Sequence, residues 1–525
     1  MLASRVAPLV YTGLFGFFCA AMLTLSRGWP ALPTIHDESS FLLAADTFAH
    51  GRLTNPAPPL AEHFETFHVL VRPSYASKYP PAQGLMLALG QVLTGSPIVG
   101  VWLSAGLLAA TLTWMLRAWF RTSWAVWGSV LITLLLAGSI RDGYWLATFW
   151  GGTVAAIGAA LVYGAARRLT RTPSALSAIL FALGLGILAL SRPFEGLLVS
   201  IPPIVSVGAW LLRDRSSTSA WRMTHVFAPL AVVIAAIGGF ALYYNARVTG
   251  NPLRMPYAEY EAQYGSVPLF VFAPRSAVRT IDYANREMRR FYADPVAQRS
   301  MNTPLMFLRA QVGRVIRIHR FLAPGMILVL ALLGVIGNAW RRLAMPLAGT
   351  GLVLAGSFLV TWYWPHYIAP VIAPWAILLT NGARRLALLK PRRIGLCILW
   401  LVFATTAANA IVTTLNSYAA RTRRPSQWPV QRYSIERALE RQGGRHLVIV
   451  SYGPKHSFHN EWVHNRANFT TAPVIWARSL SPTKDSLLIQ HFRDRVAWRL
   501  DVDTDSTHSP LRPTAEPTTS ELLQR

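Results

Sequence analysis

The chain has 525 residues, of which 53% are hydrophobic and only 14% are charged. This balance excludes intrinsic disorder and disfavours an ordinary water-soluble enzyme, whose surface needs more charge. Lys and Arg number 50 against 23 Asp and Glu, a formal net charge of +27, and in so apolar a chain this excess indicates membrane orientation and no nucleic-acid partner.

About eleven apolar windows are separated by short charged connections, and each can cross a bilayer as a helix. The first is interpreted as an anchor and not a cleaved signal peptide, because its apolar run is long and a poor cleavage site follows it. The predicted fold class is an all-α polytopic membrane bundle. The windows lie at about 7–26, 97–117, 123–139, 150–167, 175–191, 195–212, 225–245, 320–339, 344–362, 367–383 and 394–414.

Basic residues gather in every second connection, accompanied by a single acidic residue, Asp214. By the positive-inside rule these connections are cytoplasmic, so the N-terminus is expected inside and the C-terminal segment outside. The basic residues are Arg117, Arg121, Arg167, Arg168, Arg171, Arg213, Arg215, Arg222, Arg341, Arg342, Arg384, Arg385, Lys390, Arg392 and Arg393.

The outer side carries two loops too long to be simple turns, at about 27–96 and 246–319, and everything after the last window. That last part contains short apolar runs with the spacing of strands in a small α/β domain. The predicted organisation is a transmembrane domain at 1–414, an extracytoplasmic α/β domain at 415–503 and a disordered Thr-, Ser- and Pro-rich tail at 504–525.

The strongest local signal for chemistry is the acidic pair Asp37-Glu38, which follows the first window. Two adjacent carboxylates are costly at a membrane surface unless water, a cation or a substrate uses them, although a loop can also solvate them. One carboxylate can act as a general base while its neighbour orients it or helps to hold a metal. Residues 39–48 are compatible with a helix along the interface that fixes the pair at its N-terminus.

Further polar groups lie at the outer ends of the windows. Lys78, beside the stiff Pro80-Pro81 corner, could hold a phosphate or merely extend to the interface. Two Arg-acid pairs, Arg141 with Asp142 and Arg192 with Glu195, could be interhelical salt bridges or could line a cavity. The aromatic motif that contains His366 and Tyr367 could be an interfacial anchor or part of the same cavity. Since all share one face of the membrane, a single outward-opening cavity is predicted. Its residues would be Asp37, Glu38, Lys78, Tyr79, Asp142, Arg192, Glu195, His366 and Tyr367.

Together these features resemble the C-type membrane glycosyltransferases (GT-C): a first span, an acidic pair in a long outer loop, an interfacial helix and a Lys-Tyr-Pro-Pro corner. The pattern is most similar to the bacterial branch near the protein O-mannosyltransferases of glycosyltransferase family 39 and the lipid A aminoarabinose transferase. The segment from Tyr452 to Asn465 resembles a C-terminal segment of uncharacterised bacterial membrane proteins.

The resemblance implies an enzyme that moves a sugar from a polyprenyl-phosphate donor to a protein, lipid or envelope glycan outside the bacterial cytoplasmic (inner) membrane. It implies Asp37 as the general base, Glu38 as its partner, and Lys78 and Arg192 as phosphate ligands, with His366 nearby. No cofactor is required, and a divalent ion such as Mg²⁺ or Mn²⁺ stays open.

Two other classes of function fit a polytopic chain: a transporter or flippase for lipid-linked sugars, and a non-catalytic scaffold for envelope assembly. Transporters place ionisable groups near the bilayer midplane and contain inverted repeats. The predicted windows have almost no charge at their centres, which favours chemistry at the interface. His456, His459 and His464 are irregularly spaced and lack accompanying Cys, which favours surface histidines over a metal site.

Overall fold

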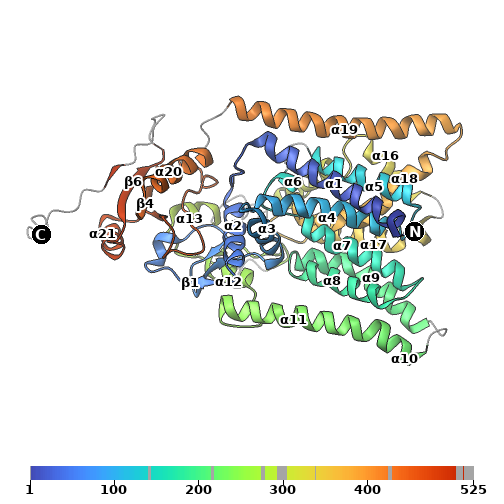
Figure 1. The fold of residues 1–525 in the computed structure, drawn as a ribbon, viewed down its shortest axis with the longest axis horizontal. Coiled ribbons are helices and arrows are strands. Elements are labelled where there is room, and N and C mark those ends of the chain that lie inside the picture. The colour runs from blue at the N-terminus through green and yellow to red at the C-terminus, as the bar shows by residue number, and fades with distance from the viewer. Residues whose placement is uncertain are drawn as a thin grey trace, which may run out of the picture.

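In the computed structural model the N-terminal end of the chain and the small C-terminal domain lie at opposite ends of an elongated helical bundle (Figure 1). Helix α2 and its neighbours lie between the bundle and that domain. The predicted class, a helical bundle with a small C-terminal α/β domain, is confirmed by these elements. The structure describes residues 2–139, 144–213, 218–273, 278–292, 304–336, 339–423, 428–503 and 512–513.

The bundle helices are apolar on most of their faces, as expected for helices that contact other helices and lipid. Helices α1 and α4 cross closely: a Cβ at Gly16 would lie 2.7 Å from the carbonyl oxygen of Ala105, so only glycine fits there. The bundle comprises α1 (Leu2–Arg27), α4 (Ile98–Leu116), α5 (Thr122–Ala137), α6 (Tyr144–Ala147), α7 (Thr153–Leu169), α8 (Ala175–Ala189), α9 (Pro193–Arg213), α10 (Ser219–Arg222), η2 (Met223–Phe227), α11 (Ala228–Thr249), α15 (Pro304–Leu322), α16 (Ile327–Val335), α17 (Ala339–Ser357), η4 (Pro365–Val371), α18 (Ile372–Leu386) and α19 (Arg392–Arg423).

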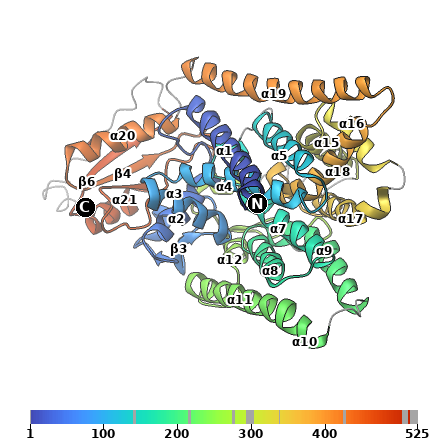
Figure 2. The ribbon, with the colours of Figure 1, turned by 45° about the vertical axis from the view of Figure 1, so that its right-hand side comes forward.

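Among the described residues, five helices are long and apolar enough to cross a membrane, or six if the pair α15 and α16, bent by 95°, forms one span. The expected count of about eleven is therefore not confirmed. Some expected spans are short helices: α5 has 16 residues, which is about 24 Å against a hydrocarbon core of about 30 Å. Helix α19 also continues to Arg423, past the domain boundary expected at 414. Helices α11 and α19 run along opposite sides of the bundle (Figures 1 and 2).

The first outer segment folds into helices and a small antiparallel sheet of strand order β1-β3-β2. Its helix α3 begins with Pro81, which suits the first turn, and ends at Gly95 with a φ of 74°, a left-handed cap that favours glycine. The elements of the two outer segments are α2 (His36–Ala49), β1 (Asn55–Pro56), η1 (Ala61–Phe64), β2 (Val69–Leu70), β3 (Ser74–Ser77), α3 (Pro81–Thr94), α12 (Pro256–Tyr264) and α13 (Arg286–Tyr292).

The C-terminal domain is a sheet of order β5-β4-β6-β7. Strand β4 is parallel to both β5 and β6, and the strands account for the short apolar runs expected in this part of the chain. Strand β7 pairs antiparallel with β6, although it lies in the tail expected to be disordered; the rest of that tail lies outside the described residues. The elements are α20 (Trp428–Gln442), β4 (His446–Ser451), β5 (Val474–Arg478), α21 (Pro482–His491), β6 (Val496–Asp501) and β7 (Arg512–Pro513).

A buried ionic cluster fixes this domain on the second outer segment. The guanidinium of Arg478 in β5 lies 2.7 Å from Glu287 of α13 and 2.6 Å from Glu461. All three side chains are at most 4% exposed. The hydroxyl of Tyr452 donates to Glu461 as well. The loop between β4 and β5 is thereby held against α13.

Apolar packing joins the same domain to the first outer segment. Phe64 and Tyr75 from that segment share one buried cluster with Leu447 and Ile475 of the C-terminal sheet. The three outer parts of the chain thus form one packed body, and the position of residues 453–464, here called the 453–464 loop, is set relative to α2.

Candidate active site

The first turn of α2 places the two acidic residues in different directions. Ile35 is extended and the helix begins at His36, so Asp37 and Glu38 both occupy the first turn, where the helix dipole favours negative charge. Consecutive helical residues point about 100° apart. Asp37 therefore faces a cavity, while Glu38 faces inward, where it accepts hydrogen bonds from the Thr34 N–H at 2.7 Å, the Thr34 hydroxyl at 2.9 Å and the Phe149 N–H at 3.0 Å.

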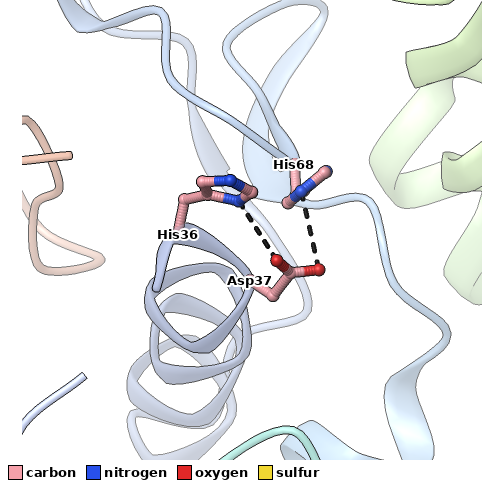
Figure 3. Close-up of side chains that lie close together, drawn as sticks. All are labelled: His36, Asp37 and His68. Atoms are coloured by element: carbon pink, nitrogen blue, oxygen red, sulfur yellow. Dashed lines mark ion pairs between the residues drawn. The ribbon is translucent and has the colours of Figure 1, made fainter. Parts of the chain in front are cut away.

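The Asp37 carboxylate is surrounded by two imidazoles and a phenol. Nδ1 of His36 lies 3.1 Å from one carboxylate oxygen, and Nε2 of His68 lies 3.5 Å from the other (Figure 3). The Tyr79 hydroxyl donates a short hydrogen bond to the same carboxylate. Burial opposes ionisation, but attraction to His68 and His36 holds the pKa of Asp37 well below its ordinary 3.8.

His68 reaches Asp37 from a strained backbone. Its φ is +63°, in the left-handed region that favours glycine. Three hydrogen bonds hold it: its N–H donates to Tyr260, and its carbonyl accepts from the Ser40 hydroxyl and the Lys78 N–H. Such strain persists only where the surroundings over-determine it, and it clusters at functional sites. Burial lowers the pKa of His68 to about 3, and the neighbouring Asp37 carboxylate acts in the opposite direction.

Lys78 is paired inside the protein and does not extend to the interface. Its ammonium lies 3.1 Å from the Glu261 carboxylate. It also lies over the rings of Tyr257 at 4.6 Å and Tyr260 at 4.5 Å. The side chain is only 5% exposed. Its charge is therefore largely balanced before any ligand binds.

Arg192 supplies a second cation to the lining of the cavity. Its guanidinium lies 4.5 Å from the ring centroid of Tyr367, and within the described residues no carboxylate lies at ion-pair distance from it. Glu195, one turn further along α9, lines the same cavity. Arg192 is thus better placed than Lys78, which is ion-paired with Glu261, to donate hydrogen bonds to an anionic ligand.

One cavity of about 450 Å³ brings these groups together. One part is polar and is lined by Asp37, His68, Lys78 and Arg192. Another part is apolar, with walls from several helices and loops: Phe194, Ala241, Leu269, Phe270 and Val360. A cavity with a charged part and a long apolar wall suits an amphiphile with an anionic head group.

The structure gathers most of the predicted cavity residues but not all. Asp37, Lys78, Tyr79, Arg192, Glu195 and Tyr367 line the cavity. Glu38 does not, so it is not the partner of Asp37 that the sequence suggested. His366 packs behind the wall, with its ring 4.7 Å from Trp150 and 4.6 Å from Tyr367. Asp142 lies outside the described residues.

Among the acidic, basic and imidazole residues that line the cavity, four were not predicted: His36, His68, Glu261 and His459. His36 had a signal, since it directly precedes Asp37. His459 comes from the 453–464 loop, and its ring is stacked on that of His36 at 5.6 Å. The expectation of surface histidines holds for His459, which is exposed although it lines the cavity, but not for His456, which is 4% exposed and lies 2.9 Å from Asp503.

Replacing Glu38 separates its structural role from a role beside Asp37. Both carboxylate oxygens of Glu38 accept a backbone N–H. In Glu38→Gln the side-chain NH₂ must replace one of these oxygens and face a donor, so we expect the free energy of unfolding to fall by about 1–3 kcal/mol. We expect the rate of the reaction that depends on Asp37 to be unchanged. Thermal unfolding measures the first and the activity assay below the second; a variant that is fully stable but inactive would contradict this assignment.

Comparisons with known proteins place this geometry in a known architecture. No family model and no curated protein matches the chain. Among solved structures, ArnT from Cupriavidus metallidurans in the apo state superposes with a TM-score of 0.50 and 13% identity, over 95% of this chain and 93% of ArnT. The chain has the ArnT fold. The crystal structure of ArnT bound to undecaprenyl phosphate matches with a TM-score of 0.48 and 15% identity, over 96% of this chain and 91% of ArnT.

The ArnT fold accounts for the two-part architecture of the chain. Because 95% of the chain is covered, the match includes both the membrane bundle and most of the C-terminal domain. The GT-C resemblance predicted from the acidic pair and the Lys-Tyr-Pro-Pro corner is confirmed at the level of the fold. The long apolar helices of the bundle support the expectation of an integral membrane protein.

Proposed function

We propose that this protein is a membrane glycosyltransferase that moves a sugar from a polyprenyl-phosphate donor to an acceptor outside the bacterial cytoplasmic membrane. The N-terminus is then cytoplasmic, and the cavity and C-terminal domain face outward. The observation that carries the proposal is the single cavity in which Asp37, Arg192 and a long apolar wall meet. ArnT, whose fold this chain shares, has been crystallised with undecaprenyl phosphate, a ligand of that amphiphilic kind.

The proposed reaction is an inverting displacement. The acceptor oxygen or nitrogen forms a bond to the anomeric carbon of the sugar while its proton passes to Asp37. The bond between that carbon and the phosphate oxygen breaks, and its electron pair leaves with the lipid phosphate. A general base typically contributes about 10²–10⁴ in rate. The low pKa of Asp37 keeps the carboxylate ionised and ready at neutral pH.

Arg192 is proposed to stabilise the departing phosphate. Its guanidinium can donate two parallel hydrogen bonds to phosphate oxygens. Lys78 is proposed to add positive potential from beside Tyr79, although Glu261 already balances part of its charge. The apolar wall, which includes Ala241 of α11 and Phe270, would hold the first isoprene units of the donor.

The deciding experiment supplies the purified protein in lipid with a panel of labelled polyprenyl-phosphate sugars and an envelope extract. The expected result is transfer of label to an acceptor from one donor, with release of polyprenyl phosphate. If no donor reacts while labelled lipid-linked sugar crosses the bilayer, a flippase replaces this proposal. If the protein neither reacts with the lipid nor moves it, the scaffold reading replaces it.

Arg192→Gln tests the phosphate-stabilising role. Loss of one preorganised charge at a leaving group costs about 10²–10³ in kcat, and Arg192→Lys should restore part of the rate because it keeps the charge without the planar fork. Steady-state kinetics on the reactive donor measure both variants. Equal loss in the two variants would show that packing against Tyr367 matters more than charge.

The pH dependence follows from the low pKa of Asp37. A carboxyl with a pKa below 3.8 stays deprotonated from pH 7 down to pH 5, so the rate should not fall there through loss of the base. The fall due to Asp37 is expected only below about pH 4. The measurement is kcat/KM against pH for the parent and Asp37→Glu. If kcat/KM instead falls with a midpoint between pH 5 and 7, and this midpoint shifts in Asp37→Glu, the low pKa given to Asp37 would be wrong.

A further inference from the structure

His36, Asp37 and His68 have the composition and spacing of a metal-ligand set. One donor atom from each lies within 4.8 Å of the others, and Figure 3 shows both rings directed at the carboxylate. The two measured separations from the carboxylate oxygens are 3.1 Å and 3.5 Å. Ligands bound tetrahedrally at about 2.0–2.1 Å are about 3.3 Å apart along an edge of the tetrahedron. The separations between each imidazole and the carboxylate are therefore close to those of a bound ion, and the two imidazoles, at most 4.8 Å apart, would move together by up to about 1.5 Å to share it.

The imidazole nitrogens have unused bonding capacity. His36 and His68 are 3% and 6% exposed. Apart from the contacts with Asp37, neither ring nitrogen of His36, nor Nδ1 of His68, has a hydrogen-bond partner among the described residues. Buried polar atoms without partners are rare in folded proteins and costly. An ion would use one nitrogen of each ring.

The backbone of His68 gives a second, independent indication of function. Its left-handed conformation would suit glycine better, yet three hydrogen bonds hold it in place. That arrangement directs an imidazole at Asp37 at a cost in backbone energy.

We propose that His36, Asp37 and His68 bind one divalent transition-metal ion of the Zn²⁺ type. Two imidazoles and one carboxylate match the ligand preference of such ions. Mg²⁺ prefers an octahedral shell of oxygen ligands, so the Mg²⁺ considered from the sequence fits these residues poorly. Three protein ligands leave a fourth position open toward the cavity, the arrangement of catalytic and not structural zinc sites.

The role of this ion rests on the proposed glycosyl transfer. An acceptor oxygen in the fourth position would become more acidic and would be held at the polar part of the cavity. One Asp37 oxygen would bind the ion, and the other would still take the acceptor proton. The atoms exchanged are those of the displacement described above, and the ion is regenerated unchanged.

The first test measures binding without any sugar donor. The full-length protein, purified in lipid without a polyhistidine tag and stripped with a chelator, is titrated with Zn²⁺ in a calorimeter and with Co²⁺ in a spectrophotometer. The expected result is one ion per chain, a tetrahedral Co²⁺ absorption spectrum, and no competition from Mg²⁺. Absence of stoichiometric Zn²⁺ or Co²⁺ binding would overturn the proposal, and so would equal competition by Mg²⁺.

Variants assign the ligands. His36→Gln and His68→Gln should each weaken Zn²⁺ binding by more than the 10–100-fold that loss of an outer-shell partner costs. His50→Gln is the matched control: it lies at the end of the same helix with its side chain 59% exposed, and it should bind as the parent does. Thermal unfolding checks that each variant is folded. Parent-like binding by folded His68→Gln would overturn the assignment.

The activity assay separates this inference from the proposed function. Transfer that chelation abolishes and Zn²⁺ restores would support the role of the ion. Transfer that survives complete chelation but is lost in Asp37→Asn would overturn that role and leave the glycosyltransferase proposal intact. Stoichiometric Zn²⁺ binding in a protein that transfers no sugar would support the metal site and overturn the proposed function.

Discussion

Asp37→Asn is expected to lower kcat for sugar transfer by about 10²–10⁴ while leaving the fold intact. The amide is nearly isosteric with the carboxylate but cannot accept the acceptor proton. It also presents an NH₂ group either toward His36, which now contacts one carboxylate oxygen, or toward His68 and Tyr79, which contact the other. Single-turnover kinetics with the reactive donor isolate the chemical step.

Donor binding and an exposed acid serve as controls for Asp37→Asn. Donor affinity should change little, because the proposed phosphate and tail contacts involve Arg192 and the apolar wall. Asp282→Asn, a fully exposed acid of the outer side, should transfer sugar at the parental rate. A folded Asp37→Asn protein that keeps more than about a tenth of the parental rate would remove Asp37 from the role of general base.

Arg478→Leu is expected to destabilise the protein by about 3–5 kcal/mol. The substitution leaves the carboxylates of Glu287 and Glu461 buried close together without the cation that now lies between them. It also removes the contact between the guanidinium and the Tyr452 ring, which is 4.6 Å away. Thermal and denaturant unfolding of the protein in detergent measure the loss.

An exposed Arg of the same domain is the matched control. Arg445 forms an ion pair with Asp494, and both side chains are more than 40% exposed. Exposed pairs contribute only about 0–1 kcal/mol, so Arg445→Leu should unfold close to the parent. Equal unfolding of Arg478→Leu and Arg445→Leu would show that the buried cluster does not hold the domain.

The secondary structure of the C-terminal domain could be predicted because its signals are local. Apolar runs of five or six residues identified β4, β5 and β6, each a buried or partly buried strand. The meeting of Asp37, Lys78 and Arg192 in one cavity could also be predicted, because the alternation of charged connections assigned all three to the same side of the membrane. The number of membrane-spanning helices was harder to predict, because short helices inside a bundle are as apolar as helices long enough to cross the bilayer.

Long-range pairings in the site could not be predicted. Lys78 and Glu261 are 183 positions apart, and no sequence pattern links them. The left-handed backbone of His68 also left no signal, because a non-glycine residue rarely adopts it. The different directions of the Asp37 and Glu38 side chains could have been predicted if the helix had been expected to begin at His36, where α2 begins. The sequence analysis expected a helix only from residue 39.

The origin of the cavity walls has a consequence for biosynthesis. The polar part begins near residue 36, but His459 of the 453–464 loop completes it, and the buried cluster that holds this loop needs Arg478. Chains emerge from the ribosome N-terminus first, and early domains fold before late ones exist. A nascent chain would thus carry an unfinished site through insertion of its entire bundle, and chemistry would begin only after the last domain has emerged and docked.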